Sequence, residues 1–143
     1  MILNELHQLS INAAKKAGSF LLENKFLNKE IYQEEGRDIK LEIDRQSEIL
    51  IRKILENSGL NVIGEEYGGQ INNDEDFWVI DPLDGTSNYF RGIDQCCVSI
   101  SLMNRDTAKI GVIYNFNSGE LFTAYAGGGA YLNGNRIAVS NIE

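Results

Sequence analysis

The stretch Trp-Val-Ile-Asp-Pro-Leu-Asp-Gly-Thr-Ser-Asn-Tyr-Phe, residues 78–90, joins a short apolar run to two closely spaced carboxylates. Pro82 fixes its own φ and biases Asp81 toward an extended conformation, so we expect a stiff turn that carries Asp81 and Asp84. Two carboxylates held close together repel each other unless a cation lies between them, and Mg²⁺ prefers hard oxygen ligands. The stretch therefore indicates a metal site at the end of a strand.

An ordinary turn is the competing interpretation of the same residues. Asp, Pro, Gly, Thr, Ser and Asn all favour turns, and Asp-Gly commonly separates strands. A second acidic feature upstream favours the site, because Asn-Val-Ile-Gly-Glu-Glu, residues 61–66, is also an apolar run that ends in carboxylates. We expect Glu65, Asp81 and Asp84 to meet at one edge of a sheet.

With these two motifs in view, the chain resembles the inositol monophosphatase family, which belongs to a Mg²⁺-dependent, lithium-sensitive phosphatase superfamily. Residues 78–90 are similar to the family signature, and Gly64-Glu65-Glu66 is similar to its upstream acidic motif. The likeness extends through the first helix, a second helix opened at Asp44, a strand at 97–102 and a closing run at 127–134. Family members are considerably longer, so the resemblance implies one N-terminal α+β domain over residues 1–143, with the C-terminal domain absent.

The resemblance also implies which residues hold the metal. Glu65, Asp81, Asp84 and the backbone carbonyl of Leu83 would ligate Mg²⁺, which takes few protein oxygens and keeps several waters. One metal would lower the pKa of a bound water that attacks the phosphate, and another would neutralise the phosphate and the leaving alkoxide. The implied reaction is hydrolysis of a phosphate monoester by a metal-activated water.

Two further residues are implied to be catalytic. Thr86 resembles the family threonine that orients and deprotonates the water, and Asp44 resembles its aspartate partner, since a hydroxyl is too weak an acid to act alone. The backbone N–H groups of Gly85 and Thr86 would bind the substrate phosphate, because helix N-termini favour anions. Structural roles compete with these, since Thr86 can cap the turn and Asp44 stands where a helix N-cap stands. Both kinds of role can coexist.

Apolar residues at helical spacing predict two helices, over residues 2–25 and about 44–57. Between them we expect a short extended piece at 31–33 and an acidic loop at 34–38. In the second helix Asp44 or Ser47 is available near the start and Gly59 lies just past the end. Its apolar residues include Ile49, Leu50, Ile54 and Leu55.

The second half of the chain predicts strands at about 96–104, 107–116, 120–126 and 136–140, separated by hairpin signals at 104–106, 117–119 and 133–135. Helices followed by consecutive hairpins predict an α+β fold, with two N-terminal helices packed on an antiparallel sheet. The resemblance implies six strands and the first half of a layered sandwich. Residues 127–129 predict a tight turn, because the Lys-Ser/Thr of a phosphate-binding loop does not follow them.

Charge and composition narrow the partners. The formal charge of −8, from 13 basic and 21 acidic residues, argues against a nucleic acid or an anionic membrane as partner. A small phosphorylated substrate remains compatible, since bound Mg²⁺ reverses the local sign of charge. No apolar run of about 18 residues and no signal peptide is present, which predicts a cytoplasmic location. Cys96 and Cys97 are neighbours on a strand and are expected to be buried, unbridged thiols, and His7 a surface or core residue.

Three functions follow from these expectations. The first is Mg²⁺-dependent hydrolysis of inositol monophosphate or a similar small polyol or sugar phosphate. The second is a relative of the bisphosphate nucleotidase or fructose-bisphosphatase type. The third is a truncated, noncatalytic domain that binds metal or a partner. An uncovered apolar face of the sheet would also favour a homodimer or other self-association.

Overall fold

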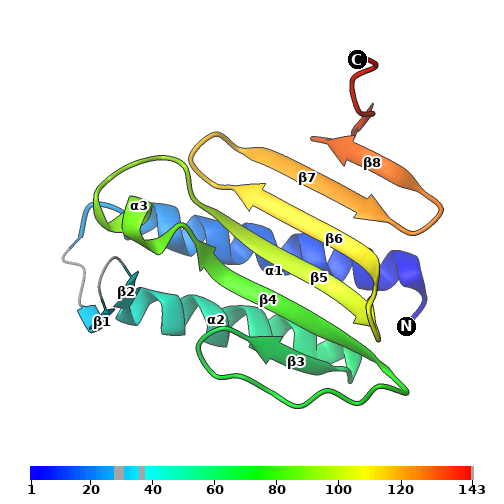
Figure 1. The fold of residues 1–143 in the computed structure, drawn as a ribbon, viewed down its shortest axis with the longest axis horizontal. Coiled ribbons are helices and arrows are strands. Elements are labelled where there is room, and N and C mark those ends of the chain that lie inside the picture. The colour runs from blue at the N-terminus through cyan, green and yellow to red at the C-terminus, as the bar shows by residue number, and fades with distance from the viewer. Residues whose placement is uncertain (28–30, 36–37, 143) are drawn as a thin grey trace.

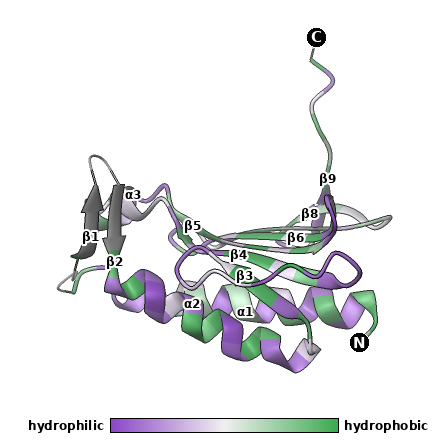
Figure 2. Ribbon diagram, turned by 60° about the horizontal axis from the view of Figure 1, so that its bottom comes forward, coloured by the Kyte–Doolittle hydropathy of each residue, from purple (hydrophilic) through white to green (hydrophobic). Residues whose placement is uncertain are grey.

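Two long helices lie side by side under one face of a twisted sheet (Figure 1). The computed structural model describes residues 1–27, 31–35 and 38–142. Figure 2 shows α1 and α2 on the same side of the sheet, and neither of them covers the opposite face, which we call the open face. The elements are α1 (Leu3–Glu23), β1 (Ile31–Glu35), β2 (Asp38–Leu41), α2 (Glu42–Leu55), a 3₁₀ turn η1 (Glu56–Ser58), β3 (Asn61–Gly64), β4 (Asp76–Asp84), α3 (Thr86–Phe90), β5 (Cys97–Asn104), β6 (Thr107–Asn115), β7 (Glu120–Tyr125), β8 (Gly129–Leu132) and β9 (Asn135–Ile137).

The main sheet has seven strands in the order β3-β4-β5-β6-β7-β8-β9, and the α+β prediction is confirmed. The expected count of six strands was wrong, because Gly129–Leu132 forms β8 between β7 and β9. The expected tight turn at residues 127–129 precedes this strand, with positive φ at Gly127 and Gly129. The main sheet is antiparallel as expected except at one edge, where β3 runs parallel to β4. A long connection at 65–75, rather than a hairpin, carries the chain back to the start of the sheet before β4 begins.

Helix α1 packs small side chains against the sheet. Because Gly18 has no side chain, the ring of Tyr114 on β6 approaches it closely, and a Cβ added there would lie 2.5 Å from Tyr114 Cδ1. His7 is buried on this face, so of the two expected positions, surface and core, it takes the core position. The buried residues of α1 are Leu6, His7, Ser10, Ala13, Ala14, Ala17, Gly18 and Leu21.

Helix α2 begins two residues earlier than expected. Asp44 is the third helical residue rather than the N-cap, and its Oδ2 accepts a hydrogen bond of 2.9 Å from the backbone N–H of Leu41. Of the apolar residues of this helix, Leu55 is buried, whereas Ile49 is 53% exposed. The buried positions of α2 combine three polar residues with two apolar ones and are Asp44, Ser47, Glu48, Ile51 and Leu55.

A two-stranded hairpin of β1 and β2 precedes α2 and stands apart from the main sheet. The expected extended piece at 31–33 continues to Glu35, and Asp38 begins β2, so the backbone is extended where a loop was expected. Gly36 and Arg37, within the expected loop, lie outside the described residues.

The core lies between the two helices and the face of the sheet that they cover. Alternate residues of β4, β5 and β6 point into it, and Trp78 at its centre donates an indole N–H hydrogen bond of 3.0 Å to Ser58 Oγ. In the described ranges no helix has a stretch that is long and apolar enough to cross a membrane. The buried residues of the three central strands include Trp78, Ile80, Val98, Ile100, Leu102, Ile110 and Val112.

Candidate functional site: an acidic edge of the sheet

The parallel pair β3 and β4 brings two acidic residues together. Gly64, the last residue of β3, is the register partner of Ile80. The residues that follow them, Glu65 and Asp81, are therefore neighbours at the same edge of the sheet. The two carboxyl groups lie close enough to share a hydrogen bond when one of them carries a proton. The sequence prediction that these two strands bring their acids together is therefore confirmed for this pair.

A bulge in β4 places Asp84 on the same face as Asp81. Residues three apart in a regular strand point to opposite faces. Here Asp81 pairs with Ser99 and Asp84 pairs with Cys97, and these two partners are only two residues apart on β5. The bulge absorbs the extra residue, so both aspartates lie on the open face. Pro82 fits at this place because a bulge does not require its missing N–H.

The acidic signature was expected to be a turn, and this expectation was wrong for residues 81–84. These residues continue β4 to its end at Asp84, and the chain turns only at Gly85, whose φ is +87°. A Cβ at this position would lie 2.8 Å from the carbonyl oxygen of Gln95. Glycine is therefore required both by the backbone conformation and by the close approach of a second segment.

Three hydrogen bonds hold the bulge in shape. Asp81 Oδ1 accepts from the backbone N–H of Leu83 at 3.2 Å. The Thr86 hydroxyl donates to the Leu83 carbonyl at 3.1 Å, which ties the start of α3 to the bulge, while the N-cap of α3 is Gly85. The hydroxyl of Ser47, from α2, donates to the Pro82 carbonyl at 2.9 Å. The segment that carries the two aspartates is thus held by α2 through Ser47 and by the side chains of Asp81 and Thr86 within the chain.

Burial and neighbouring negative charges act together on Asp81. Burial, the charge of Glu65 and its hydrogen bond, and the charge of Asp84 together raise the pKa of Asp81 to about 7. A cation placed between such groups favours their charged forms and removes the repulsion. Carboxylate and carbonyl oxygens are also the hard donors that Mg²⁺ takes. The donor types and their mutual repulsion therefore fit a divalent cation.

The complete ligand set remains a prediction. Within residues 1–27, 31–35 and 38–142, His, Cys, Asp and Glu side chains form no group of three or more that could hold a metal ion. Glu65 and Asp81 are in contact, whereas Asp84 is exposed and acts on Asp81 through its charge. The proposed set of Glu65, Asp81, the Leu83 carbonyl and Asp84 would have to draw together around a cation.

Asp44 lies beneath the site on α2. Its side chain is 1% exposed, and its charge contributes, after burial and Cys96, to raising the pKa of Tyr89 on α3. Thr86 begins the same short helix α3. The two residues expected to be catalytic thus lie on neighbouring elements, and their partnership in catalysis stays a prediction.

Sequence reasoning missed Cys97 as a residue of the site. Its half-buried Sγ donates to Asp84 Oδ2 at 3.8 Å, and burial, followed by the charges of Asp84 and Asp81, raises the pKa of the thiol to about 12. Cys96 points to the other side and is buried, as expected for both. Cys97 belongs to the site because it pairs with Asp84 across β4 and β5. This pairing depends on the bulge, so the sequence alone did not indicate it.

Glu48 and Arg52 of α2 were also missed. The Glu48 carboxylate accepts hydrogen bonds from the backbone N–H groups of Glu66 at 2.7 Å and Tyr67 at 3.1 Å, and pairs with Arg52. These bonds hold the segment that begins with Glu65. A usable signal was present in the sequence, because Glu48 follows Asp44 by four positions and precedes Ile51 by three, which puts it on the same helix face.

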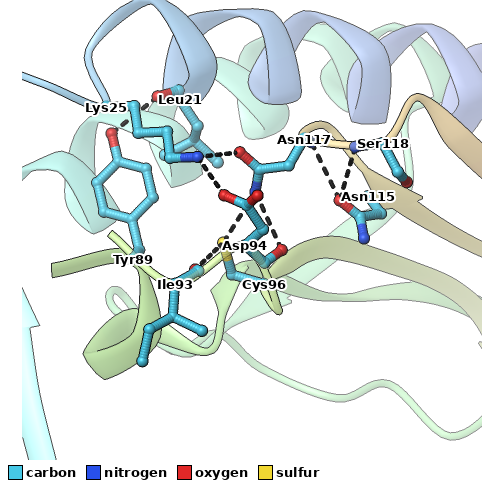
Figure 3. Close-up of polar contacts among 9 residues, drawn as sticks. All are labelled: Leu21, Lys25, Tyr89, Ile93, Asp94, Cys96, Asn115, Asn117 and Ser118. Carbon is cyan, nitrogen blue, oxygen red and sulfur yellow. Dashed lines mark hydrogen bonds and ion pairs between the residues drawn. The ribbon is translucent and has the colours of Figure 1, made fainter. Parts of the chain in front are cut away.

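A polar network anchors the loop that closes over Gly85 (Figure 3). Lys25, just after α1, forms an ion pair with Asp94 and donates to Asn117 Oδ1 at 2.7 Å. Asn117 in turn donates to the Asp94 carbonyl at 3.1 Å and to Cys96 Sγ at 3.4 Å. The network ties α1, the loop after α3 and the turn between β6 and β7 to one another.

The family of this chain follows from comparison with known proteins. The model of the inositol monophosphatase family matches residues 2–143. A Nus factor SuhB of Xylella fastidiosa is 40% identical over 137 residues, which are 93% of this chain and 50% of that protein. Inositol monophosphatase 2 of Solanum lycopersicum is 38% identical over 146 residues, with 97% of this chain and 55% of that protein covered.

A solved structure agrees with the sequence comparison. The extragenic suppressor protein SuhB of Bartonella henselae has a TM-score of 0.88 at 34% identity, covering 94% of this chain and 54% of that chain. The chain thus spans about half the length of the curated relatives that it matches. A match from residue 2 to residue 143, together with the acidic edge formed by β3 and β4, shows that this chain belongs to the inositol monophosphatase family.

Proposed function

We propose that the chain is the metal-binding part of a Mg²⁺-dependent phosphatase that hydrolyses inositol monophosphate or a similar small polyol or sugar phosphate. The observation that carries the proposal is the contact of Glu65 with Asp81, with Asp84 on the same face of the sheet, in a member of this family. A cytoplasmic location belongs to the proposal and is compatible with two unbridged cysteines.

The residues that would hold the cation are Glu65, Asp81, Asp84 and the carbonyl oxygen of Leu83. When bound, the cation supplies positive charge that binds the phosphate and makes a nearby water more acidic. The Leu83 carbonyl already accepts the Thr86 hydroxyl, but a carbonyl oxygen has two lone pairs and can serve both partners.

The remaining groups would orient the reactants. Thr86 is fixed at the end of the acidic segment by its hydrogen bond to Leu83, where its hydroxyl can hold a water beside the phosphate. Asp44 would accept the proton that Thr86 passes on. The backbone N–H groups of Gly85 and Thr86 would bind the phosphate oxygens.

The test is Mg²⁺-dependent release of phosphate from inositol monophosphate by the Asp84→Asn variant. We expect at least a 100-fold loss of turnover, because the substitution removes a charged ligand. The matched control is Asp74→Asn, since Asp74 is an exposed carboxylate paired only loosely, at 3.8 Å, with Arg105. Turnover by Asp84→Asn at the level of this control would overturn the metal role. Parallel assays with an adenosine bisphosphate and fructose bisphosphate distinguish the second enzymatic function.

A noncatalytic interaction domain is the second candidate, and the open face of the sheet favours it. Val79, Ile113 and Phe122 are partly exposed there, and several relatives carry the name Nus factor. This function predicts Mg²⁺ binding without turnover. Self-association through the same face predicts a sedimentation coefficient that rises with concentration, and a monodisperse monomer would count against it.

A further inference from the structure

Glu48 is a fully buried carboxylate on the inward face of α2. Its side chain is 0% exposed, and its Oε1 lies 2.8 Å from both Nε and Nη2 of Arg52, one helical turn later. Burying an ion pair costs about as much free energy as the attraction returns, and apolar replacements are often equally stable. Stability alone therefore does not account for a charged pair at this position.

The carboxylate of Glu48 fills the inside of a closed turn. Gly64 and Gly68 exchange two backbone hydrogen bonds of 2.9 Å each, which closes the turn of residues 64–68. Inside it, Glu48 Oε2 accepts from the N–H of Glu66, and Oε1 accepts from the N–H of Tyr67. Glu65, the first residue of the turn after the strand, is thereby fixed in direction by the two residues that follow it.

Gly64 is shaped to admit this carboxylate. A Cβ added at Gly64 would lie 2.1 Å from Glu48 Oε1, closer than any two such atoms can approach. Arg52 completes the enclosure, because its Nη1 donates to the Val62 carbonyl at 3.0 Å and its Nη2 donates to the Gly68 carbonyl at 2.5 Å. The pair from α2 therefore holds both β3 and the far end of the turn.

The preceding residue of α2 holds the other acidic segment. Ser47 is fully buried and donates to the Pro82 carbonyl, between Asp81 and Asp84. Two consecutive helical residues thus contact the two separate segments that carry Glu65 and Asp81. Because a helix is rigid over one turn, α2 sets the separation of Glu65 and Asp81 whether or not a cation lies between them.

We infer that Glu48 is a positioning residue for divalent-cation binding, which holds Glu65 beside Asp81 by organising the turn at residues 64–68. The inference rests on the proposed function, because it assigns Glu65 and Asp81 to the cation. Replacing a residue that orients a metal ligand without touching the metal typically weakens metal affinity by about 10–100-fold.

The test is Mn²⁺ binding, measured by electron paramagnetic resonance, to the chain with Glu48→Gln. The glutamine amide has nearly the same shape as the carboxylate, but one of its two oxygens is replaced by an NH₂ group. This group cannot accept a hydrogen bond, so at least one N–H donor of Glu66, Tyr67 or Arg52 loses its acceptor. We expect about 10-fold weaker Mn²⁺ binding, with a circular dichroism spectrum like that of the unsubstituted protein. The matched control is Glu56→Gln, an exposed glutamate directly after α2, for which we expect unchanged binding.

The outcomes separate the inference from the proposed function. Unchanged Mn²⁺ affinity in folded Glu48→Gln would overturn the inference alone, since a merely structural role changes stability and leaves the affinity of the folded protein as it was. Absence of Mn²⁺ binding by the unsubstituted protein would overturn the proposed metal site and the inference with it. If Glu48→Gln fails to fold, Arg52→Lys decides, because it keeps the charge but cannot bridge Val62 and Gly68: weaker binding supports the inference and unchanged binding overturns it.

Discussion

The two faces of the sheet differ in burial and in charge, although the same strands form both. The face toward α1 and α2 carries Trp78, Ile80 and Ile100, which are almost completely buried. The open face carries partly exposed apolar residues such as Ile113, together with Asp81 and Cys97. Neighbouring residues of β4 therefore serve different purposes, since one stabilises the fold and the next forms the candidate site.

The difference shows how a site with repelling charges can be built on a stable support. Residues that repel one another, such as Asp81 and Glu65, lie on the face that contributes little to the core. The covered face contributes the hydrophobic free energy that offsets the repulsion. Substitutions should accordingly be costly on the covered face and neutral or stabilising on the open face.

Trp78→Ala should have the largest effect on this comparison. The side chain is fully buried and its indole donates to Ser58, so we expect a loss of about 3–5 kcal/mol in the free energy of unfolding. Urea denaturation followed by circular dichroism measures this loss. A cost under about 1 kcal/mol, as expected for an exposed position, would show that the covered face is not the main source of stability.

Gly18→Ala tests how closely α1 approaches the covered face. Alanine in a helix is usually more stable than glycine by about 1 kcal/mol. Here the new Cβ would lie 2.5 Å from two ring atoms of Tyr114, so we expect a net loss of about 1–3 kcal/mol. The neighbouring exposed Ser19→Ala should be neutral or slightly stabilising in the same thermal melts. A higher melting temperature for Gly18→Ala would contradict the close approach.

Asp81→Asn should stabilise the metal-free protein by an amount that depends on pH. The folded-state pKa of Asp81 is raised to about 7, above its ordinary value, so its favourable contribution is present at low pH and is lost as the pH rises through 7. In EDTA at pH 8, we expect Asp81→Asn to raise the free energy of unfolding by about 1 kcal/mol, a value reduced for partial exposure.

Thermal melts at pH 8 and at pH 4 measure this difference. The gain should shrink at pH 4, where the carboxyl group is protonated in the folded protein. Asp74→Asn provides the control, because its side chain is highly exposed. An Asp81→Asn variant that is less stable than the unsubstituted protein at pH 8 would show that repulsion at the acidic edge is not significant.

Ile113→Thr should have the smallest effect. Ile113 is 47% exposed on the open face, and threonine keeps the β-branched shape that strands favour. We expect a change within about 0.5 kcal/mol in urea denaturation. A loss above about 2 kcal/mol, the range of a buried residue, would mean that another layer or a second molecule covers this face in solution, and sedimentation velocity would identify which.

Much of the fold could be predicted from local patterns. Helix α1, strands β5 to β7 and their turns follow from apolar spacing and from glycine-containing or asparagine-containing hairpin signals. Strand β8 was missed because it is four residues long and begins at the last of three consecutive glycines, so its sequence indicates a turn. The inward face of α2 was not predicted, because a buried Glu48 occupies a place that a hydrophobicity pattern assigns to an apolar residue.

The site was predictable in its residues and less so in its geometry. Two apolar runs that end in acids were sufficient to expect Glu65 next to Asp81. The bulge was not predictable, because it exists only in the pairing of β4 with the distant strand β5. The contribution of Glu48 was hidden for a similar reason, since it depends on a turn 16 to 20 residues away in the chain.

The bulge between Asp81 and Asp84 also limits how the chain can change in length. It compensates for one residue, and an insertion of a single amino acid in this segment would exceed that capacity. The second carboxylate would then point to the covered face of the sheet, even though the composition of the motif were preserved. Residue types alone are therefore an incomplete description of this signature, because the interval between its two acids is as strictly constrained as the acids themselves.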